Sequence, residues 1–455
     1  MLDTIKYLSH IIYHFIRQGH HMRYFIAAAL ISVATLQALD IQQVVQETLQ
    51  SNPKMQTQLA NYNAVSKDLD SANAGYYPEL NFTGAVGPER VERDQLNSTQ
   101  SDGTLIRREA ALVFTENIWK GGATQDNIEE QRSRINSAAY ATLSAANSLS
   151  LKAITVYINL LRQQKLLALS LENVKTHENI LGKIKEKTEA GLGKRSDVEQ
   201  TESRYALAYA NYYAAKNNYQ DAYSQFIRVY GQVVSVEELE TPKAPELADL
   251  TFEQRLAQAE EFNPALLTLQ ENIDAQKSVY EQTKSTFYPE LDGELAGNWN
   301  QNIHGIEGED DSYSAMLRLR YNLFRGGSDE AQRVKNQILI TKERSALNDT
   351  RRDVDEELKL ATAANELIEI QKGYLAQHSE YTQKTANSYA EEYNLGRRTL
   401  IDLLNAELEY NSARQSQTNA AMDQLLAQYR ILSVTGQLLD AMNADITSKV
   451  PLYSK

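Results

Sequence analysis

Cysteine is absent from the 455-residue sequence, and its absence excludes several kinds of site. Without thiols the chain has no disulfide framework, no thiolate metal centre and no cysteine nucleophile. Basic charge is also scarce, because 46 Lys and Arg stand against 60 Asp and Glu, for a formal net charge of −14. Nucleic-acid binding depends on clustered basic residues, so this balance predicts no nucleic-acid partner.

Long apolar runs are missing from the main part of the chain. Beyond residue 39, no stretch reaches the ~18 apolar residues that a membrane-spanning helix needs. In lipid, only helices and closed sheets satisfy their own backbone hydrogen bonds. If this part of the chain crosses a membrane, we therefore expect it to do so with strands.

The N-terminus carries the pattern of a secretory signal. Met22 and Arg23 precede an apolar run over residues 24–36, and the small residue Ala38 follows. A basic start, a short apolar core and a small residue at the end predict export, with cleavage after Ala38. The alternative is an N-terminal anchor helix. We assign residues 1–38 to a signal peptide and an upstream segment.

The rest of the chain is one unit written twice, and repeats of this kind determine the architecture. Short motifs recur in the same order in both halves: Asn52-Pro53 and Asn263-Pro264, Tyr77-Pro78 and Tyr288-Pro289, Gly121-Gly122 and Gly326-Gly327, Leu192 to Ser196 and Leu395 to Thr399, and Tyr230-Gly231 and Thr435-Gly436. We therefore divide the chain into a first repeat (39–232), a linker with two prolines (233–250), a second repeat (251–443) and a tail (444–455).

Each repeat predicts the same series of elements. A short helix (41–50 and 251–261) precedes Asn-Pro, which suits an N-cap followed by Pro in the first turn. A second helix runs to Tyr-Pro, two strands follow, and Gly-Gly forms a strand-to-helix corner. A very long helix (123–190 and 327–394), a Gly-containing turn and a returning helix (197–231 and 400–443) complete the repeat. The long helices are on the order of 100 Å, which predicts a coiled coil or a sheet of helices.

The strand segments alternate in a manner typical of membrane strands. In 291–300 and 313–324 apolar and polar residues occupy alternate positions, as in transmembrane barrel strands. The first repeat alternates less regularly, and Glu116 interrupts its apolar face. A half-solvated sheet is the alternative. The signal peptide, the strand length and the lack of another membrane segment favour the membrane.

Four strands per chain cannot close a barrel, and lipid does not tolerate an open sheet edge. Two chains would supply eight strands, whose interior is filled by side chains, whereas three chains supply twelve and leave room for water. Because Asp, Glu, Arg and Asn occupy one face of the strands, we expect the open, trimeric form.

These motifs, in this order and duplicated over residues 40–443, make the chain similar to the TolC family of outer-membrane efflux and secretion ducts. The resemblance implies a mainly α fold with a small transmembrane β part, in which a trimer builds a twelve-stranded β-barrel and a twelve-helix periplasmic tube. It also implies the outer membrane of a Gram-negative bacterium, contact with outer-membrane lipid, a periplasmic adaptor protein and an inner-membrane transporter, either ABC or proton-driven. Such a duct is passive and is not an enzyme.

The resemblance further implies a gate at the periplasmic tip, built from the two helix turns. By position, Tyr393 and Arg398 are expected to latch to Ser196 and Asp197, and Asp402 to supply an acidic ring. Asn405 occupies the second acidic position. The first turn is read as two residues shorter than the second. Ordinary helix-terminus charges are the alternative for Asp197, Arg398 and Asp402. The turn residues expected to contact the adaptor are Gly191, Leu192, Gly193, Asn394, Leu395 and Gly396.

Other candidate sites carry little signal. The Gly-Gly pairs lack the Lys-Ser/Thr of a phosphate loop, and no pair of carboxylates stands out as an acid and base. His177, His304 and His378 stand apart and are expected on the surface, so we predict no metal site and no cofactor. A periplasmic adaptor and a structural coiled-coil protein remain alternative functions. The cargo is protein or small molecules, and of the two we favour type I secretion of protein.

Overall fold

The computed structural model describes residues 39–92, 104–234 and 239–453, so the predicted signal segment 1–38 lies outside the described residues. The chain forms two compact units. The first comprises Met1–Asp40 and Val233–Pro242, and its described residues include one parallel bridge between Leu39 and Leu239. The second, Ile41–Gln232 and Lys243–Lys455, holds the helices and strands described below.

Both repeats of the second unit begin with two helices joined by a capping asparagine. These are α2 (Ile41–Ser51) and α3 (Pro53–Asn73), and α6 (Phe252–Phe262) and α7 (Pro264–Lys284). Asn52 Oδ1 accepts a hydrogen bond from Lys54 N (3.0 Å), and Asn263 Oδ1 accepts one from Ala265 N (2.9 Å). The Asn-Pro motif thus starts a helix as predicted, because the side chain satisfies an N–H group that the first turn leaves unpaired.

The same two asparagines also tie the start of each repeat to its end. Asn52 Nδ2 donates to Val229 O at 3.0 Å, and Asn263 Nδ2 donates to Val434 O at 2.9 Å. Each accepting residue lies in the last turn of the returning helix of its own repeat, α5 (Arg195–Tyr230) or α9 (Leu400–Val434). One side chain therefore caps the start of one helix and bonds a carbonyl in the last turn of another.

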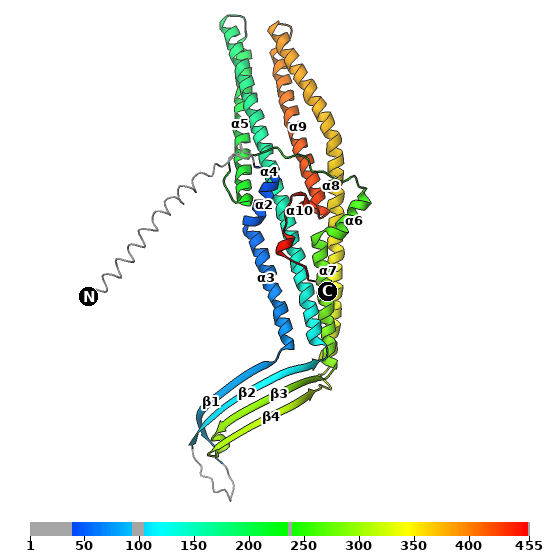
Figure 1. The fold of residues 1–455 in the computed structure, drawn as a ribbon. Helices are drawn as coiled ribbons and strands as arrows, with labels where there is room; N and C mark the ends of the chain where they lie inside the picture. Colours follow the sequence, from blue (N-terminus) through cyan, green and yellow to red (C-terminus); the bar gives the residue numbers. More distant parts are fainter. Residues whose placement is uncertain (1–38, 93–103, 235–238, 454–455) are drawn as a thin grey trace, which may run out of the picture. The chain divides into compact units, whose positions relative to one another are not determined.

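The four strands form one antiparallel sheet in the order β1-β2-β3-β4, at one end of the helices of this unit (Figure 1). They are β1 (Glu79–Arg90), β2 (Thr104–Lys120), β3 (Glu290–Gln301) and β4 (Glu309–Arg320). The expected continuation of the last strand to Phe324 is wrong. Arg320 pairs with Glu290, the first residue of β3, and Pro289 before it has no N–H group to extend the ladder.

The long helices are α4 (Ala123–Glu189) and α8 (Ser328–Asn394), each of 67 residues. Gly122 and Gly327 precede them with φ of 87° and 84°, a left-handed conformation that favours glycine. The Gly-Gly pairs are therefore strand-to-helix corners, as predicted. The final helix does not run to residue 443, because Gly436 (φ 77°) ends α9 and a separate helix, α10 (Leu438–Ala441), follows.

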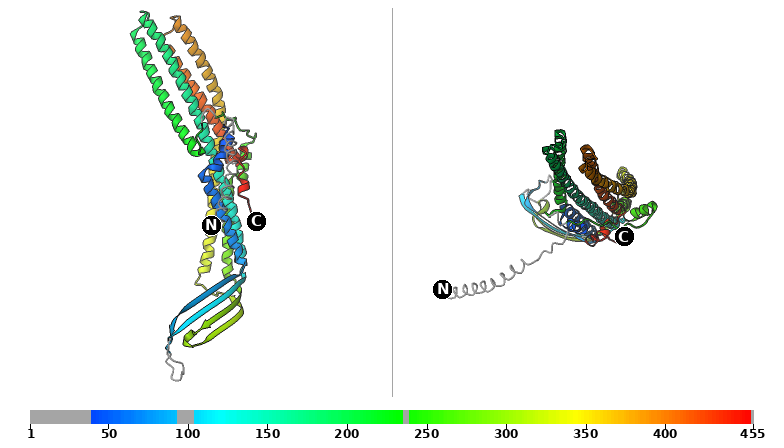
Figure 2. Two further views of the ribbon diagram at one scale, coloured as in Figure 1. Left: turned by 60° about the vertical axis from the view of Figure 1, so that its left-hand side comes forward. Right: turned by 90° about the horizontal axis from the view of Figure 1, so that it is seen from above.

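Helix packing divides the second unit along its length (Figures 1 and 2). In the half next to the sheet, α4 contacts α3 and α7, and α7 also contacts α8. In the other half, α4 contacts α5 and α9, and α9 also contacts α8. Either half therefore contains four helices from one chain.

One prediction about exposure is corrected by this packing. His177 is buried on α4, with 4% of its surface exposed. It occupies the same helix face as the buried residues Val174, Leu181 and Ile184, and burial lowers its pKa. The C-terminal segment is attached to α4, because Asn136 bonds both to the carbonyl (3.0 Å) and to the N–H group (2.8 Å) of Tyr453.

Equivalent glycines at the ends of α5 and α9 allow a matched test of the local packing. Gly231 and Gly436 both have positive φ, so alanine at either position should cost about 1–2 kcal/mol. At Gly436 an added Cβ would also lie 2.3 Å from Phe262 O, whereas at Gly231 the nearest atom, Ser51 Oγ, is 3.9 Å away. We expect Gly436→Ala to lower the melting temperature in detergent more than Gly231→Ala, as followed by circular dichroism. Equal shifts would contradict the close packing at Gly436.

Candidate functional site

The sheet presents one apolar and one polar face, and the strand register brings like residues together. One row across the four strands joins Phe82, Leu112, Gly297 and Tyr313. The next apolar row joins Leu80, Phe114, Leu295 and Ala315. The alternation that the sequence shows strand by strand is thus continuous over the whole sheet, and many of its apolar side chains are exposed in the single chain.

The opposite face is held by ion pairs between neighbouring strands. Arg318 on β4 donates from Nε (2.8 Å) and Nη2 (2.7 Å) to the carboxylate of Glu294 on β3. Arg320 pairs with Asp292 at 2.5 Å, and Asp292 also accepts from Asn117 Nδ2 on β2 (2.8 Å). The charges of this face therefore compensate one another in part, and the side chains of Arg318 and Arg320 remain exposed, whereas Asp292 is buried.

Charged residues mark both ends of the apolar face, and an aromatic pair lies near one end. On β2, Arg108 and Glu116 lie on this face eight positions apart, or about 26 Å at ~3.3 Å per residue. Trp119 packs edge-on against Tyr288 near one boundary, with ring centroids 6.0 Å apart. The ~26 Å interval agrees with the ~25 Å apolar band of a transmembrane barrel, which aromatic residues flank.

Helices can also span a lipid bilayer. None of the described helices is long and apolar enough to cross a membrane.

The two turns at the far end of the helices have the same backbone geometry. Gly191 (φ 74°) and Gly396 (φ 71°) each occupy the left-handed position of a Schellman motif. Leu192 N donates to Lys187 O (2.8 Å), and Arg397 N donates to Glu392 O (2.9 Å). Both turns span five residues, so the expectation that the first is two residues shorter is wrong.

The correction changes which residues of the two repeats are equivalent. The repeated letters Leu-Gly suggested that Gly193 matches Gly396, but the residue that adopts the same φ is Gly191. With this match, Asp197 in the first turn of α5 is equivalent to Asp402 in the first turn of α9. Sequence letters could not decide this, because two glycines stand near the first turn and only the fold shows which one reverses the chain.

The turns are joined by an apolar cluster in which Tyr393 takes part. Ile184 of α4 packs with Leu400 and Leu404 of α9, and Tyr393 lies against them. The Lys187 ammonium is 4.4 Å from the centroid of the Tyr393 ring. Burial and the nearby Asp197 carboxylate raise the pKa of the Tyr393 phenol. The structure thus brings Tyr393 and Asp197 together within one chain.

Arg398 has other partners in the single chain. Its guanidinium donates to Glu392 Oε2 from two nitrogens, both at 2.8 Å, and it lies 4.0 Å from the centroid of the Tyr389 ring. Among the described residues it is therefore held by its own end of α8, and Ser196 is not one of its partners.

Asp402 and Asn405 take part in local contacts. Asp402 accepts a hydrogen bond from Thr399 Oγ1 (2.6 Å), and its N–H group donates back to the same hydroxyl (3.3 Å). This is a helix N-cap, which agrees with the reading of Asp402 as a helix-terminus charge. Asn405 Oδ1 accepts from Arg204 Nη2 of α5 at 3.3 Å. Position 405, expected as a second acidic position, instead links the two repeats.

Ion pairs between α4 and α9 were missed by reasoning from the sequence. Arg162 pairs with Asp423, and Arg414 pairs with Glu172 at 2.8 Å. Both pairs join the first repeat to the second, with the positive charge on α4 in one and on α9 in the other. No signal in the sequence could have found them, because the pairing depends on the register of two helices more than 200 residues apart.

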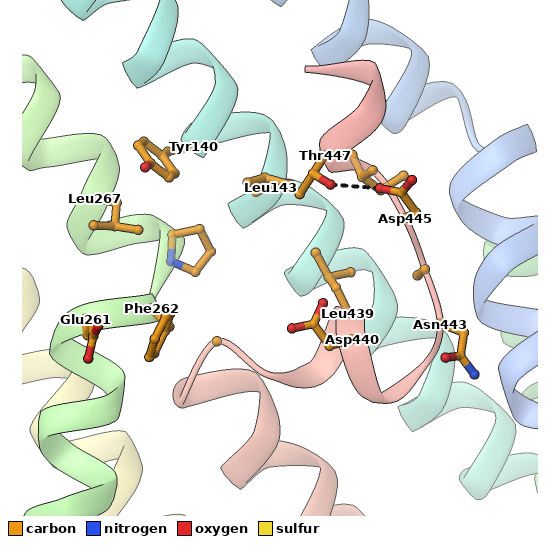
Figure 3. A pocket seen from close by; sticks show the side chains of 14 residues that line it. Tyr140, Leu143, Glu261, Phe262, Leu267, Leu439, Asp440, Asn443, Asp445 and Thr447 are labelled. Atoms are coloured by element: carbon orange, nitrogen blue, oxygen red, sulfur yellow. Dashed lines mark hydrogen bonds between the residues drawn. The ribbon is translucent and has the colours of Figure 1, made fainter. Parts of the chain in front are cut away.

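A cavity of about 770 Å³ lies where α4, α7 and the C-terminal segment meet (Figure 3). Tyr140, Leu143 and Leu267 supply apolar walls, and Asp440 and Asp445 supply carboxylates. Asp445 accepts from Thr447 Oγ1 at 2.8 Å, so it is engaged within its own segment. In the part of the chain that the structure describes, no group of three or more metal-ligating side chains comes together.

Comparisons with known proteins match this geometry. The profile of the family described as "Outer membrane efflux protein" matches residues 44–232 and 256–437. Outer membrane protein TolC of Escherichia coli (strain K12) is 23% identical over 422 residues, 88% of this chain and 83% of TolC. Proteases secretion protein PrtF of Dickeya chrysanthemi is 22% identical over 437 residues, 90% of each chain.

A solved structure shows the same fold. The CmeC outer membrane channel of Campylobacter jejuni superposes with a TM-score of 0.76 at 14% identity, covering 91% of this chain and 90% of CmeC.

Adjacent positions on β4 test the two faces of the sheet. Leu317 lies on the apolar face, opposite Gly293, and Met316 lies on the polar face, opposite Glu294. An arginine that faces lipid near the middle of the membrane costs about 2–4 kcal/mol. Leu317→Arg should therefore abolish recovery in the outer-membrane fraction, whereas Met316→Arg, which adds the same charge, should insert normally. If both variants insert equally well, the faces are assigned incorrectly.

Proposed function

Because the chain belongs to the outer membrane efflux protein family, we propose that three copies of it form one duct that crosses the outer membrane. The resemblance to the TolC family is confirmed, and the protein is an outer-membrane channel for secretion or efflux. The observation that carries the trimer is the four-stranded sheet, which has an apolar face and two unpaired edges among the described residues.

The number of copies follows from closure of the sheet. The outer edges of β1 and β4 expose a row of backbone N–H and C=O groups, and each such group left unpaired in lipid costs several kcal/mol. Eight strands from two chains would leave an interior filled by side chains, whereas twelve from three chains leave a channel. The ion-paired face of the sheet suits a water-filled interior. Four helices per chain in either half likewise become twelve around a tube.

The exposed ends of the helix turns suit a partner protein. Leu192 and Leu395 stand exposed at the two turns, beside the left-handed glycines Gly191 and Gly396. We assign the adaptor contact to these turns, with Gly193 and Asn394 included. An inner-membrane transporter, ABC or proton-driven, would supply the energy. The duct itself is passive and carries out no reaction.

Two cargo classes have support. The name of PrtF refers to secretion of proteases, and it favours protein as the cargo, which is our first choice. The description of the family refers to efflux, and it supports small molecules as the second.

The proposal is tested with the purified protein in detergent and in planar bilayers. We expect a trimer by light scattering and an ion-conducting pore, because closure of the sheet requires neighbouring copies. A folded, stable monomer that forms no pore would contradict the proposal.

The tip turns are proposed as the gate. Tyr393 and Asp197 already lie together in one chain. Arg398 is held by Glu392 within the chain, and we propose that in the trimer it reaches Asp197 and Ser196 of the next copy. Asp402 would contribute one carboxylate per chain to an acidic ring in the channel, with Asn405 as an uncharged position below it.

A double substitution tests this gate. Each hydrogen bond to a charged group contributes roughly 1.5–3 kcal/mol, and a loss of a few kcal/mol shifts a closed–open equilibrium substantially. Tyr393→Phe combined with Arg398→Ser should therefore raise single-channel conductance, with trimer yield unchanged. The control, Arg397→Ser, removes the same charge from the exposed neighbouring position, keeps Tyr393 and Arg398, and should leave conductance low. Unchanged conductance in the double variant would show that the tip is held by packing instead.

A further inference from the structure

The helix α8 leaves one stripe of large side chains uncovered. Leu360, Leu367, Tyr374 and Tyr381 follow one another at intervals of seven residues, and they are 63–70% exposed. Seven is the spacing of a coiled-coil seam. In the half of the unit away from the sheet, α4 packs against both α5 and α9, whereas α8 packs against α9. The stripe therefore has the pattern of a helix–helix contact, and no helix among the described residues covers it.

The contact between α4 and α9 supplies a template for what covers this stripe. Arg162 pairs with Asp423, and Glu172 pairs with Arg414. Ten residues forward on α4 correspond to nine residues back on α9, so the two helices run antiparallel in a constant register. This is the contact by which the first repeat joins the second within one chain.

The internal repeat extends the template to a second copy. From the Gly-Gly corner onward, equivalent residues are 205 positions apart, as at Gly121 and Gly326 or Gly191 and Gly396. The equivalent of α4 is then α8, and the equivalent of α9 is α5. Because α5 of the same chain lies against α4, the α5 that meets α8 in this way belongs to another copy.

Applied to the stripe, the template places its two tyrosines opposite tyrosines of α5. Leu367, which takes the place of Arg162, falls opposite Asn218, and Tyr209, which takes the place of Arg414, falls opposite Gln377. In the same register Tyr374 falls opposite Tyr212, and Tyr381 falls opposite Tyr205. The ring of Tyr212 packs edge-on against that of Tyr213, with centroids 5.4 Å apart. On α5 the rings of Tyr205 and Tyr209 already pack edge-on, with centroids 5.0 Å apart, and the centroids of Tyr209 and Tyr213 are 6.3 Å apart. Tyr209 and Tyr213 are exposed in the single chain.

We propose that α8 of one copy packs against α5 of a second copy in the register of the α4–α9 contact, through a seam of tyrosines. The inference rests on the proposed trimer and adds its residues and register to it. Seams around the tube then alternate: ionic within a chain, through Arg162–Asp423 and Glu172–Arg414, and aromatic between chains. Edge-on aromatic packing is specific in geometry and, unlike exposed ion pairs, is not screened by salt.

Cross-linking tests the register. Because the sequence contains no cysteine, only the introduced thiols can react. In Tyr374→Cys with Tyr212→Cys, a short bis-maleimide added to the detergent-solubilised protein should link chains into covalent dimers and trimers on a denaturing gel. The matched control is Tyr374→Cys with Tyr219→Cys, which moves one thiol seven residues along the same face, about 10 Å. It should remain largely monomeric on the gel. Tyr381→Cys with Tyr205→Cys is a second pair in the proposed register.

The outcomes separate this inference from the proposed function. A trimer by light scattering without cross-links in either in-register pair would overturn the seam and leave the duct intact. The stripe would then face an adaptor or the surrounding solvent. Equal cross-linking in the control pair would overturn the register. If the unmodified protein is not a trimer, the proposed function itself fails, and the seam fails with it.

Discussion

The structure depends on one constraint, that backbone hydrogen-bonding groups in lipid must be paired. Four strands pair three times within the chain and leave the outer edges of β1 and β4 open. A sheet with one apolar face cannot remain in that state in a membrane, and in the proposed trimer neighbouring copies complete it. The Gly-Gly corners lead each strand pair into a long helix, so in that trimer the helices continue the circle of the strands.

The contact between the two repeats is ionic along part of its length and apolar at the tip. The contact between α4 and α9 joins the repeats through two ion pairs of opposite polarity, Arg162–Asp423 and Glu172–Arg414. Such pairs are sensitive to register, since a shift of one turn would separate both of them. At the tip the same helices change to apolar packing around Ile184 and Leu404. Within one chain, the register of the two helices is thus held by charge along their length and by apolar packing at the tip.

Much of the fold follows from local signals in the sequence. Asn-Pro starts a helix in both repeats because one side chain satisfies a free N–H group, and the alternation in 291–300 reports its two faces because successive residues point to opposite sides of a strand. His177 shows where reading by residue type fails. It shares the helical spacing of Val174 and Leu181, and that periodicity, rather than the polarity of imidazole, decided its burial.

The sequence by itself determined the duplicated unit, the helices, the strands and the likeness to a family of outer-membrane ducts, because each leaves a periodic or repeated pattern. Only the tertiary structure decided that Gly191, and not Gly193, reverses the first turn. It also decided that Arg398 pairs with Glu392, and that Arg162 meets a carboxylate 261 positions away. Pairings of this kind depend on the relative position of helices distant in sequence, and that position is set by the packing of the whole unit rather than by any local run of residues.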